Sequence, residues 1–292
     1  MTTQPAAQPR PESGIVWLAS YPKSGNTWTR TFLSNLVTIM AGEQEALDIN
    51  SINRFSLGEN FVSFYKDILG YTPGPEHKKE IAEARHRVQA AIADQFEGLI
   101  FVKTHNALVV DHSQSIINFA VTSGAIYIVR NPLDVAVSLS FHMGRTIDQA
   151  IEVMATRGME TPVNDKRVHE IWSSWSEHVQ SWTRKPHPAI YIMRYEDMLA
   201  DPEKIFGGLA RHLLLNPTPA EIKLAIERSS FETVQAQEEA EGFKEKPAHA
   251  ERFFREGRAG QWKETLTPQQ VKQIVAAHGE QMKRFGYKAE RD

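Results

Sequence analysis

Basic side chains directly follow several apolar runs of this sequence. Lys23 lies in "SYPKSGNTW", Lys103 and His105 lie in "VKTHN", Arg130 follows "GAIYIV" and Arg194 follows "AIYIM". Lysine and arginine near glycine and hydroxyl side chains favour binding of phosphate or sulfate. A neutral imidazole can remove a proton near neutral pH. These residue types therefore predict group transfer on an anionic substrate, supported by fixed positive charges.

The stretch "PKSGNT" resembles a phosphate loop but departs from the Walker pattern. That pattern places its lysine after the second glycine, whereas Lys23 precedes the only glycine of this stretch, Gly25. No acidic residue directly ends the second or third apolar run, so a Walker B aspartate for Mg²⁺ is also missing. The order predicts a lysine close to the strand end, beside the bond to be broken, and no requirement for a metal.

The basic residues must be positioned by short strands that alternate with helices. The apolar runs "GIVWLAS", "GLIFVKT", "GAIYIVR" and "AIYIMRY" are typical of parallel strands buried on both faces. Helical spacing occurs in "TWTRTFLSNLVTIM", "KKEIAEARHRVQAAIADQF", "VHEIWSSWSEHVQSWTRK", "DPEKIFGGLARHLLL" and "TPQQVKQIVAAHGEQMKRFGY". Asp201 and Thr267 are expected as the N-caps of the last two helices. The alternation predicts an α/β fold, a three-layer α/β/α arrangement around a central, mostly parallel sheet. In such a sheet ligands bind outside the carboxyl ends of the strands, where the basic residues lie.

Bulk composition excludes several classes of protein. The chain has 292 residues, a net charge of −3 and no cysteine. We therefore expect no nucleic-acid partner, no membrane binding, no disulfide and no thiolate chemistry. Residues 1–13 are polar and proline-rich without an apolar signal-peptide core, which predicts a disordered tail and a cytoplasmic protein.

Five motifs in order resemble one enzyme family. "YPKSGNTW", "VKTH", "YIVRNPLDVAVSLSFH", "RYEDM" and "FFREGRAGQWKE" are similar to the signature of cytosolic sulfotransferases that use 3′-phosphoadenosine 5′-phosphosulfate (PAPS). The resemblance implies one sulfotransferase domain over residues 14–288 with a P-loop-like phosphosulfate-binding loop. It also implies PAPS as sulfuryl donor, 3′-phosphoadenosine 5′-phosphate (PAP) as product, no metal, and a small-molecule hydroxyl or amine as acceptor.

The resemblance implies roles for individual residues of the donor site. Lys23 would contact the bridging oxygen of the donor, and the 5′-phosphate would be wrapped by Ser24, Gly25, Asn26 and Thr27. The adenine would lie against Trp28, Tyr195, Ser229, Ser230 and Phe231. The 3′-phosphate would be held by Arg130, Ser138, Arg255 and Gly257.

His105 and Lys103 would act on the acceptor and the sulfuryl group. The two residues are separated by two positions of one strand, so their side chains face the same side. His105 would take the acceptor proton as general base, and Lys103 would neutralise charge on the sulfuryl oxygens during an in-line displacement. The acceptor pocket is expected around residues 55–71, 142–164 and 242–254, with His142 as one candidate.

Several parts of the sequence depart from the family or carry no functional signal. Glu256 stands where the family often has a lysine, which leaves the 3′-phosphate to Arg130, Arg255 and Arg258. The family's dimerisation motif aligns with "KETLTPQQVK", where Pro268 replaces valine, so we expect a monomer or a different dimer. The tryptophans of "IWSSWSEHVQSW" are expected in the core. The charged segment "EEAEGFKEKPAHAER" is expected to be mobile and solvated, although the matching segment of the family can close over the site.

Two alternatives to a sulfotransferase remain at this stage. A metal-dependent kinase or NTPase would also use an anion loop, but the position of Lys23 argues against it. A nucleotide-binding module without catalysis would bind PAP yet lose nothing when His105 is replaced. The intact set of Lys23, Lys103 and His105 argues against that alternative.

Overall fold

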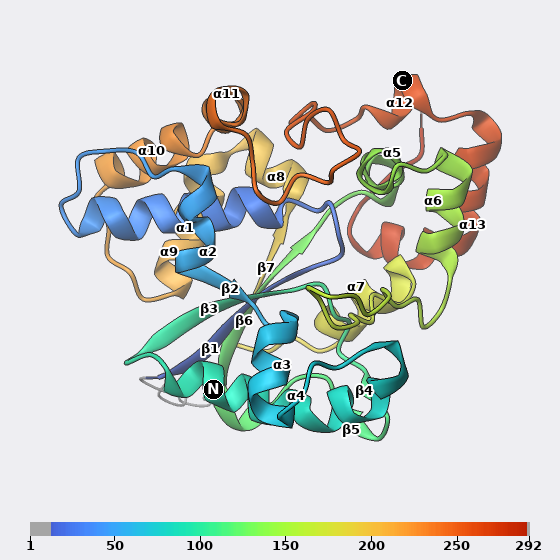
Figure 1. Ribbon diagram of the computed structural model, residues 1–292. Helices are drawn as coiled ribbons and strands as arrows, with labels where there is room; N and C mark the ends of the chain where they lie inside the picture. Colours follow the sequence, from blue (N-terminus) through green and yellow to red (C-terminus); the bar gives the residue numbers. More distant parts are fainter. Residues whose placement is uncertain (1–12, 291–292) are drawn as a thin grey trace, which may run out of the picture.

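The computed structural model describes residues 13–290, so the predicted tail lies outside the described residues except for Ser13. Its main sheet has the order β2-β3-β1-β6-β7, and every neighbouring pair of strands is parallel (Figure 1). The strands are β1 (Gly14–Ser20), β2 (Ser56–Gly58), β3 (Leu99–Thr104), β6 (Thr122–Val129) and β7 (Ile190–Arg194). The four predicted strands are confirmed. The three-residue edge strand β2 and the small hairpin of β4 (Val110–Asp111) and β5 (Gln114–Ser115) were not predicted, because such short segments carry no periodic signal.

Helices cover both faces of the sheet, which confirms the three-layer α/β/α fold. One face packs against α1 (Asn26–Met40), α9 (Pro202–His212) and α10 (Pro219–Arg228). The other packs against α3 (Val62–Leu69), α4 (Lys78–Asp94) and α7 (Trp175–Thr183). Side chains of β1 alternate between these two cores, with Trp17 in one and Leu18 in the other, and both are fully buried. This double burial explains why the strand is apolar at almost every position.

Helix ends follow the predicted caps, with one correction. The Asp201 side chain accepts a hydrogen bond from the Lys204 amide at 3.1 Å, and Thr267 caps α13 (Pro268–Arg284). The helix predicted over residues 168–185 was wrong at its start, because α7 begins only at Trp175 behind the Ser174 cap. Ser173 has φ 54°, in the left-handed region, which ends the preceding extended segment and separates it from the helix.

The remaining helices frame the carboxyl ends of the strands. They are α2 (Ile52–Phe55), α5 (Pro132–Met143), α6 (Ile147–Ala155), α8 (Tyr195–Ala200), α11 (Phe231–Glu241) and α12 (Trp262–Thr265), with short 3₁₀ turns at Ile49–Ser51, Pro75–His77 and Phe119–Val121. None of the helices within residues 13–290 has the length and apolar character needed to cross a bilayer.

The segment 242–261 between α11 and α12 runs over the strand ends (Figure 1). Phe243 is buried, and Phe253 and Phe254 pack with it against Ile49 and Val234. The expectation of a solvated segment over residues 238–252 was therefore wrong for Phe243, which is buried, whereas the mobility of the segment stays a prediction. A composition rich in charge concealed this phenylalanine, which packs with Phe253 and Phe254 of the motif that follows and so anchors the segment.

Candidate active site

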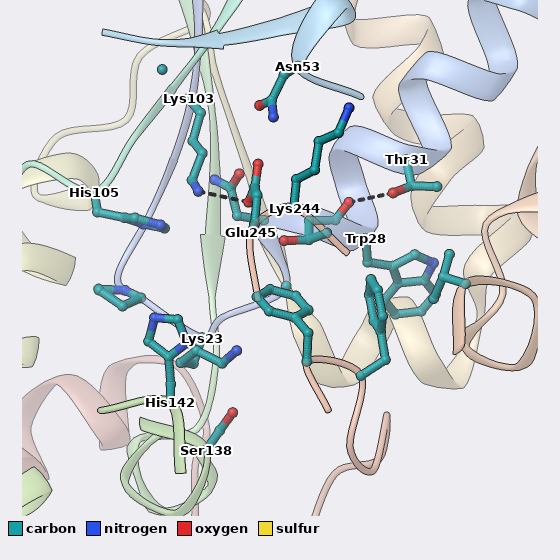
Figure 2. Close-up of a pocket in the computed structure, with 18 of the residues that line it drawn as sticks. Lys23, Trp28, Thr31, Asn53, Lys103, His105, Ser138, His142, Lys244 and Glu245 are labelled. Atoms are coloured by element: carbon teal, nitrogen blue, oxygen red, sulfur yellow. Dashed lines mark hydrogen bonds and ion pairs between the residues drawn. The ribbon is translucent and has the colours of Figure 1, made fainter. Parts of the chain in front are cut away.

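A cavity of about 1100 Å³ opens at the carboxyl ends of the parallel strands (Figure 2). Almost every residue proposed from the sequence lines it: Lys23, Gly25, Asn26, Thr27, Trp28, Lys103, His105, Arg130, Ser138, Tyr195, Ser229, Ser230, Phe231, Arg255 and Gly257. Ser24 is fully buried and is not among the lining residues. Parallel topology has thus brought segments that are far apart in the sequence to one rim.

The loop after β1 has a backbone that leads into the first turn of α1. Lys23 has φ 66° and Gly25 has φ 104°, so both lie in the left-handed region. A Cβ on Gly25 would lie 2.7 Å from Cδ2 of Tyr195, so this position needs glycine for space as well as for conformation. The side-chain Nδ2 of Asn26 donates to the Leu18 carbonyl at 2.9 Å and ties the loop back to β1. The amides that open α1 are thereby held toward the cavity, as an anion site requires.

Polar atoms of this loop and of Arg130 are left without partners. Ser24 Oγ, Asn26 Oδ1 and Arg130 Nε are buried and make no hydrogen bond to any described residue. Arg130 is fixed by two donated bonds, from Nη1 to the Lys23 carbonyl at 3.0 Å and from Nη2 to the Arg258 carbonyl at 3.1 Å. Buried polar groups are rarely left unpaired, so unpaired ones beside a cation indicate a site that a polar ligand completes. The residues present fit a phosphate-bearing nucleotide.

Lys23 reaches across the loop toward the segment that covers the cavity. Its ammonium lies 4.2 Å from the centre of the Phe253 ring. Burial, and then the charges of Arg130 and Lys103, lower the pKa of Lys23 to about 8. A lysine with this pKa is a strong hydrogen-bond donor whose charge an incoming anion would stabilise.

His105 directly follows β3 and is held by hydrogen bonds of its amide, its carbonyl and its ring. Its amide donates to Glu170 Oε1 at 3.2 Å, and its carbonyl lies 3.1 Å from His178 Nε2. Its ring Nδ1 lies 2.8 Å from the Ser20 carbonyl oxygen, which can only accept, so Nδ1 carries the proton. Burial, followed by the charge of Lys103, lowers the pKa of His105 to about 3. The imidazole is therefore neutral at physiological pH, with the lone pair on Nε2.

Lys103 and the buried Arg30 share a carboxylate from the covering segment. Glu245 Oε2 lies 3.3 Å from Lys103 Nζ (Figure 2). Glu245 Oε1 accepts from Arg30 Nη1 at 2.8 Å. The Arg30 side chain is 0 % exposed and that of Glu245 is 13 % exposed. Burial disfavours the Glu245 carboxylate, but Lys103 and Arg30 outweigh burial and lower its pKa to about 2. This ion-pair cluster fixes Lys103 and joins segment 242–261 to the sheet.

Aromatic side chains line the part of the cavity beside the loop. Trp28 and Tyr195 meet edge to face with ring centres 5.9 Å apart. A Cβ on Gly257 would lie 2.2 Å from Cδ2 of Phe231, so only glycine permits this approach. The Ser229 hydroxyl donates to the Ala225 carbonyl at 2.8 Å and is therefore already satisfied within the protein.

Three arginines differ from the sequence-based picture. Arg194 does not line the cavity, because it pairs with Asp197 at 3.1 Å and stacks on the Tyr287 ring. The prediction for Arg194 was wrong. Arg255 lines the cavity but is paired with Glu256 at 3.1 Å, and Arg258 pairs with Glu256 outside the lining. Glu256 therefore pairs with both of the arginines that were expected to replace the missing lysine at the 3′-phosphate.

Sequence reasoning missed Arg30, Glu170, His178 and Glu245. Each acts through a partner that is distant in the sequence, so no short motif identifies them. Of the tryptophans expected in the core, Trp175 and Trp182 are buried there, whereas Trp172 lines the cavity. His142 lines the cavity as proposed. No group of three histidine, aspartate or glutamate residues within residues 13–290 is close enough to hold a metal ion.

Comparison with known proteins identifies the family. The sulfotransferase domain family matches residues 14–286. The chain is 29% identical over 234 residues to luciferin sulfotransferase of Photinus pyralis, a match that covers 77% of this chain and 57% of that protein. It is 24% identical to sulfotransferase 1A1 of Canis lupus familiaris, covering 92% and 83% of the two chains.

Solved structures share the fold. Retinol dehydratase in a complex with retinol and PAP has a TM-score of 0.63 at 21% identity, covering 94% of this chain and 82% of the other. Mouse sulfotransferase SULT7A1 complexed with PAP has a TM-score of 0.60 at 19% identity, covering 92% and 85%. With nearly the whole described chain matched by the family and by the fold, this protein belongs to the sulfotransferase domain family.

Proposed function

We propose that the protein transfers the sulfuryl group of PAPS to a hydroxyl or amine of a small-molecule acceptor, with residues 14–288 acting as one domain. The observation that carries the proposal is the state of His105. The bond from Nδ1–H to the Ser20 carbonyl leaves an unprotonated Nε2 in the same cavity as Lys23 and Lys103. A neutral base beside two cations is what transfer of an anionic group to a hydroxyl requires.

The donor would be held by the residues whose polar groups are unsatisfied. Ser24 and Asn26 with the amides of Gly25 and Thr27 would bind the 5′-phosphate, since these groups lie at the start of α1. Arg130 and Ser138 would bind the 3′-phosphate, with Gly257 close by and Arg255 weakened by its pairing with Glu256. The adenine would lie between Trp28 and Phe231, beside Tyr195, Ser229 and Ser230. PAP in two structures that share this fold supports this choice of nucleotide.

The chain's own residues then account for the proton and the charge. PAPS supplies a sulfuryl group whose bond to the bridging phosphate oxygen breaks as the acceptor oxygen bonds to sulfur. His105 Nε2 would take the acceptor proton, and this assistance is worth about 10²–10⁴ in rate. Lys23 would neutralise the negative charge left on the bridging oxygen. Lys103, which lines the same cavity as His105, would stabilise the equatorial sulfuryl oxygens, and Glu245 would keep its ammonium in place.

Incubation with PAPS and a panel of phenols, alcohols and amines tests the proposal. We expect a sulfated product by mass spectrometry and binding of PAP by calorimetry. Absence of both would contradict the assignment. Mg²⁺-dependent ATP turnover would instead support a kinase, and tight PAP binding without any turnover would support a binding module.

A further inference from the structure

The wall of the cavity on the acceptor side of His105 is strongly polar. Two segments build it, because residues 59–62 pair with residues 166–168 through an antiparallel bridge between Phe61 and Arg167. The Val168 amide donates to the Asn60 carbonyl at 2.9 Å, and the Val62 amide donates to the Lys166 carbonyl at 3.0 Å. This backbone pairing holds the lining side chains of Asn60, Arg167 and Glu170 in fixed places.

Glu170 presents a carboxylate with no cation within ion-pair distance among the described residues, although Arg167 and Lys103 lie near enough to interact with it electrostatically. The residue is 8% exposed and lines the cavity, and Oε1 accepts the amide of His105 at 3.2 Å. None of the ion pairs among residues 13–290 includes it. A buried carboxylate of this kind is stable only when further hydrogen-bond donors reach it, and a ligand beside His105 can supply them.

Arg167 presents a cation on the same wall. It is half-buried, Nη1 donates to Asn60 Oδ1 at 2.5 Å, and the guanidinium lies 3.7 Å from the centre of the Phe61 ring. A Cβ at Gly58 would lie 3.0 Å from Nη1, so the glycine leaves room for this stacking. No carboxylate of the described residues is within ion-pair distance of Arg167, so its remaining N–H groups are available to a ligand.

We infer that the acceptor is a polyhydroxylated compound such as a sugar or a cyclitol, bound through hydroxyl groups next to the one that is sulfated. The inference rests on the proposed function and names its substrate class. Each hydroxyl both donates and accepts, so neighbouring hydroxyls satisfy the Glu170 carboxylate and the Arg167 guanidinium together. A purely apolar alcohol would leave the remaining lone pairs of Glu170 and the remaining N–H groups of Arg167 without a ligand partner. A cationic acceptor would meet Glu170 but would be repelled by Arg167. The rings of Phe61 and Trp172, which also line the cavity, offer apolar contact for the faces of a sugar ring.

Matched acceptors test this inference. The panel contains methyl glucoside, methyl galactoside, methyl mannoside and myo-inositol, together with cyclohexanol, cyclohexylmethanol and 4-nitrophenol. We expect kcat/KM for at least one polyol to exceed that of both cyclohexyl alcohols by about tenfold or more, because buried polar groups reject an acceptor that lacks their partners. Preferred sulfation of cyclohexanol or the phenol, or PAP binding with no polyol turnover, would overturn the inference. Loss of PAP binding together with all turnover would also remove the proposed function.

Two substitutions test whether this wall of the cavity recognises the acceptor. Glu170→Gln keeps an oxygen for the His105 amide and removes the charge, and Arg167→Gln keeps a donor for Asn60. For the best polyol we expect either variant to raise KM about tenfold, with a smaller change in kcat and an unchanged Kd for PAP. Glu152→Gln removes one charge from an exposed position outside the cavity and serves as the control.

A deoxy acceptor distinguishes recognition from a structural role. Removing a hydroxyl next to the sulfated one should cost about tenfold in kcat/KM for the wild type and much less for Glu170→Gln or Arg167→Gln, because the contact is already lost. The wall does not recognise the acceptor if removal of the hydroxyl lowers kcat/KM as much in both variants as in the wild type. The same conclusion follows if the two variants lower kcat equally for the polyol and for cyclohexanol.

Discussion

The two halves of the cavity, the proposed donor half and the proposed acceptor half, are built in different ways. The donor half comes from short stretches at strand ends and helix starts, namely residues 23–28, 130–138 and 229–231, together with residues 255–257 of the covering segment. The acceptor half combines residues 53–63 and 161–172 with the covering residues 244 and 245. Local backbone geometry creates most of the first half, whereas backbone bridges and side-chain contacts between distant segments create the second. A motif therefore describes a nucleotide site well and an acceptor site poorly.

His105 stands where the two halves meet, and its replacement should have the largest effect. We expect His105→Ala to lower kcat by about 10²–10⁴ because the base is lost. The Kd for PAP should stay within about twofold, since the donor half does not depend on the imidazole. Steady-state kinetics and calorimetry measure the two quantities. His187→Ala removes an exposed histidine outside the cavity and should leave both unchanged. A similar loss in PAP affinity would mean that the two halves are not separable at this residue.

Much of the fold could be predicted from the sequence because the signals are local. The four buried strands are continuous apolar runs, and Thr267 caps its helix in a capping box with Gln270. The loop around Gly25 was predictable for the same reason. Arg30 and Glu245 were not, because their partnership spans a large separation in the sequence and needs the tertiary fold. Residues 168–174 were mistaken for helix, because their pairing with residues 60 and 160 overrides the local pattern.

Glu245 is the residue through which the covering segment reaches the acceptor half, so it should matter for stability. We expect Glu245→Gln to lower the free energy of unfolding by about 3–5 kcal/mol, because Arg30 would keep a buried, uncompensated charge. Glu256→Gln breaks the ion pairs with Arg255 and Arg258, which are partly exposed to solvent. It should lower the free energy of unfolding by about 0–1 kcal/mol. Urea unfolding monitored by tryptophan fluorescence compares the two.

The same carboxylate predicts how stability changes with acid. The pKa of Glu245 is about 2 in the folded protein, below the ordinary value of 4.5 expected after unfolding. A lowered pKa stabilises the fold fully above pH 4.5, and this contribution is lost as the pH falls from 4.5 toward 2. Glu245→Gln should therefore show less acid sensitivity in this window than the wild type. Equal sensitivity would mean that the carboxylate is not paired in solution.

Arg130 tests the donor half alone. Arg130→Gln removes the guanidinium while keeping a side chain that can donate to the Lys23 carbonyl, so the fold should persist. We expect the Kd for PAP to rise about 10–100-fold, the range for loss of charge-assisted hydrogen bonds. At saturating PAPS, kcat should change much less than it does in His105→Ala. If the variant binds PAP normally but turns over slowly, Arg130 acts on the reacting groups and not in donor binding.

The pH profile should show the smallest effect, and it separates the two halves without any change in the acceptor. In the free protein Lys23 has a pKa of about 8, so it is charged below this pH and loses its charge above it. We expect kcat/KM for PAPS to fall above pH 8 by up to about tenfold per pH unit. His105, with a pKa of about 3, is neutral from pH 5 to 9 and should cause no loss on the acid side. Lys23→Arg keeps its charge throughout and should remove the alkaline fall, whatever it does to the maximal rate. A fall centred near pH 6.5 in the wild type would instead mean that His105 titrates as an ordinary histidine, and the bond from its Nδ1 to Ser20 would then not define the base.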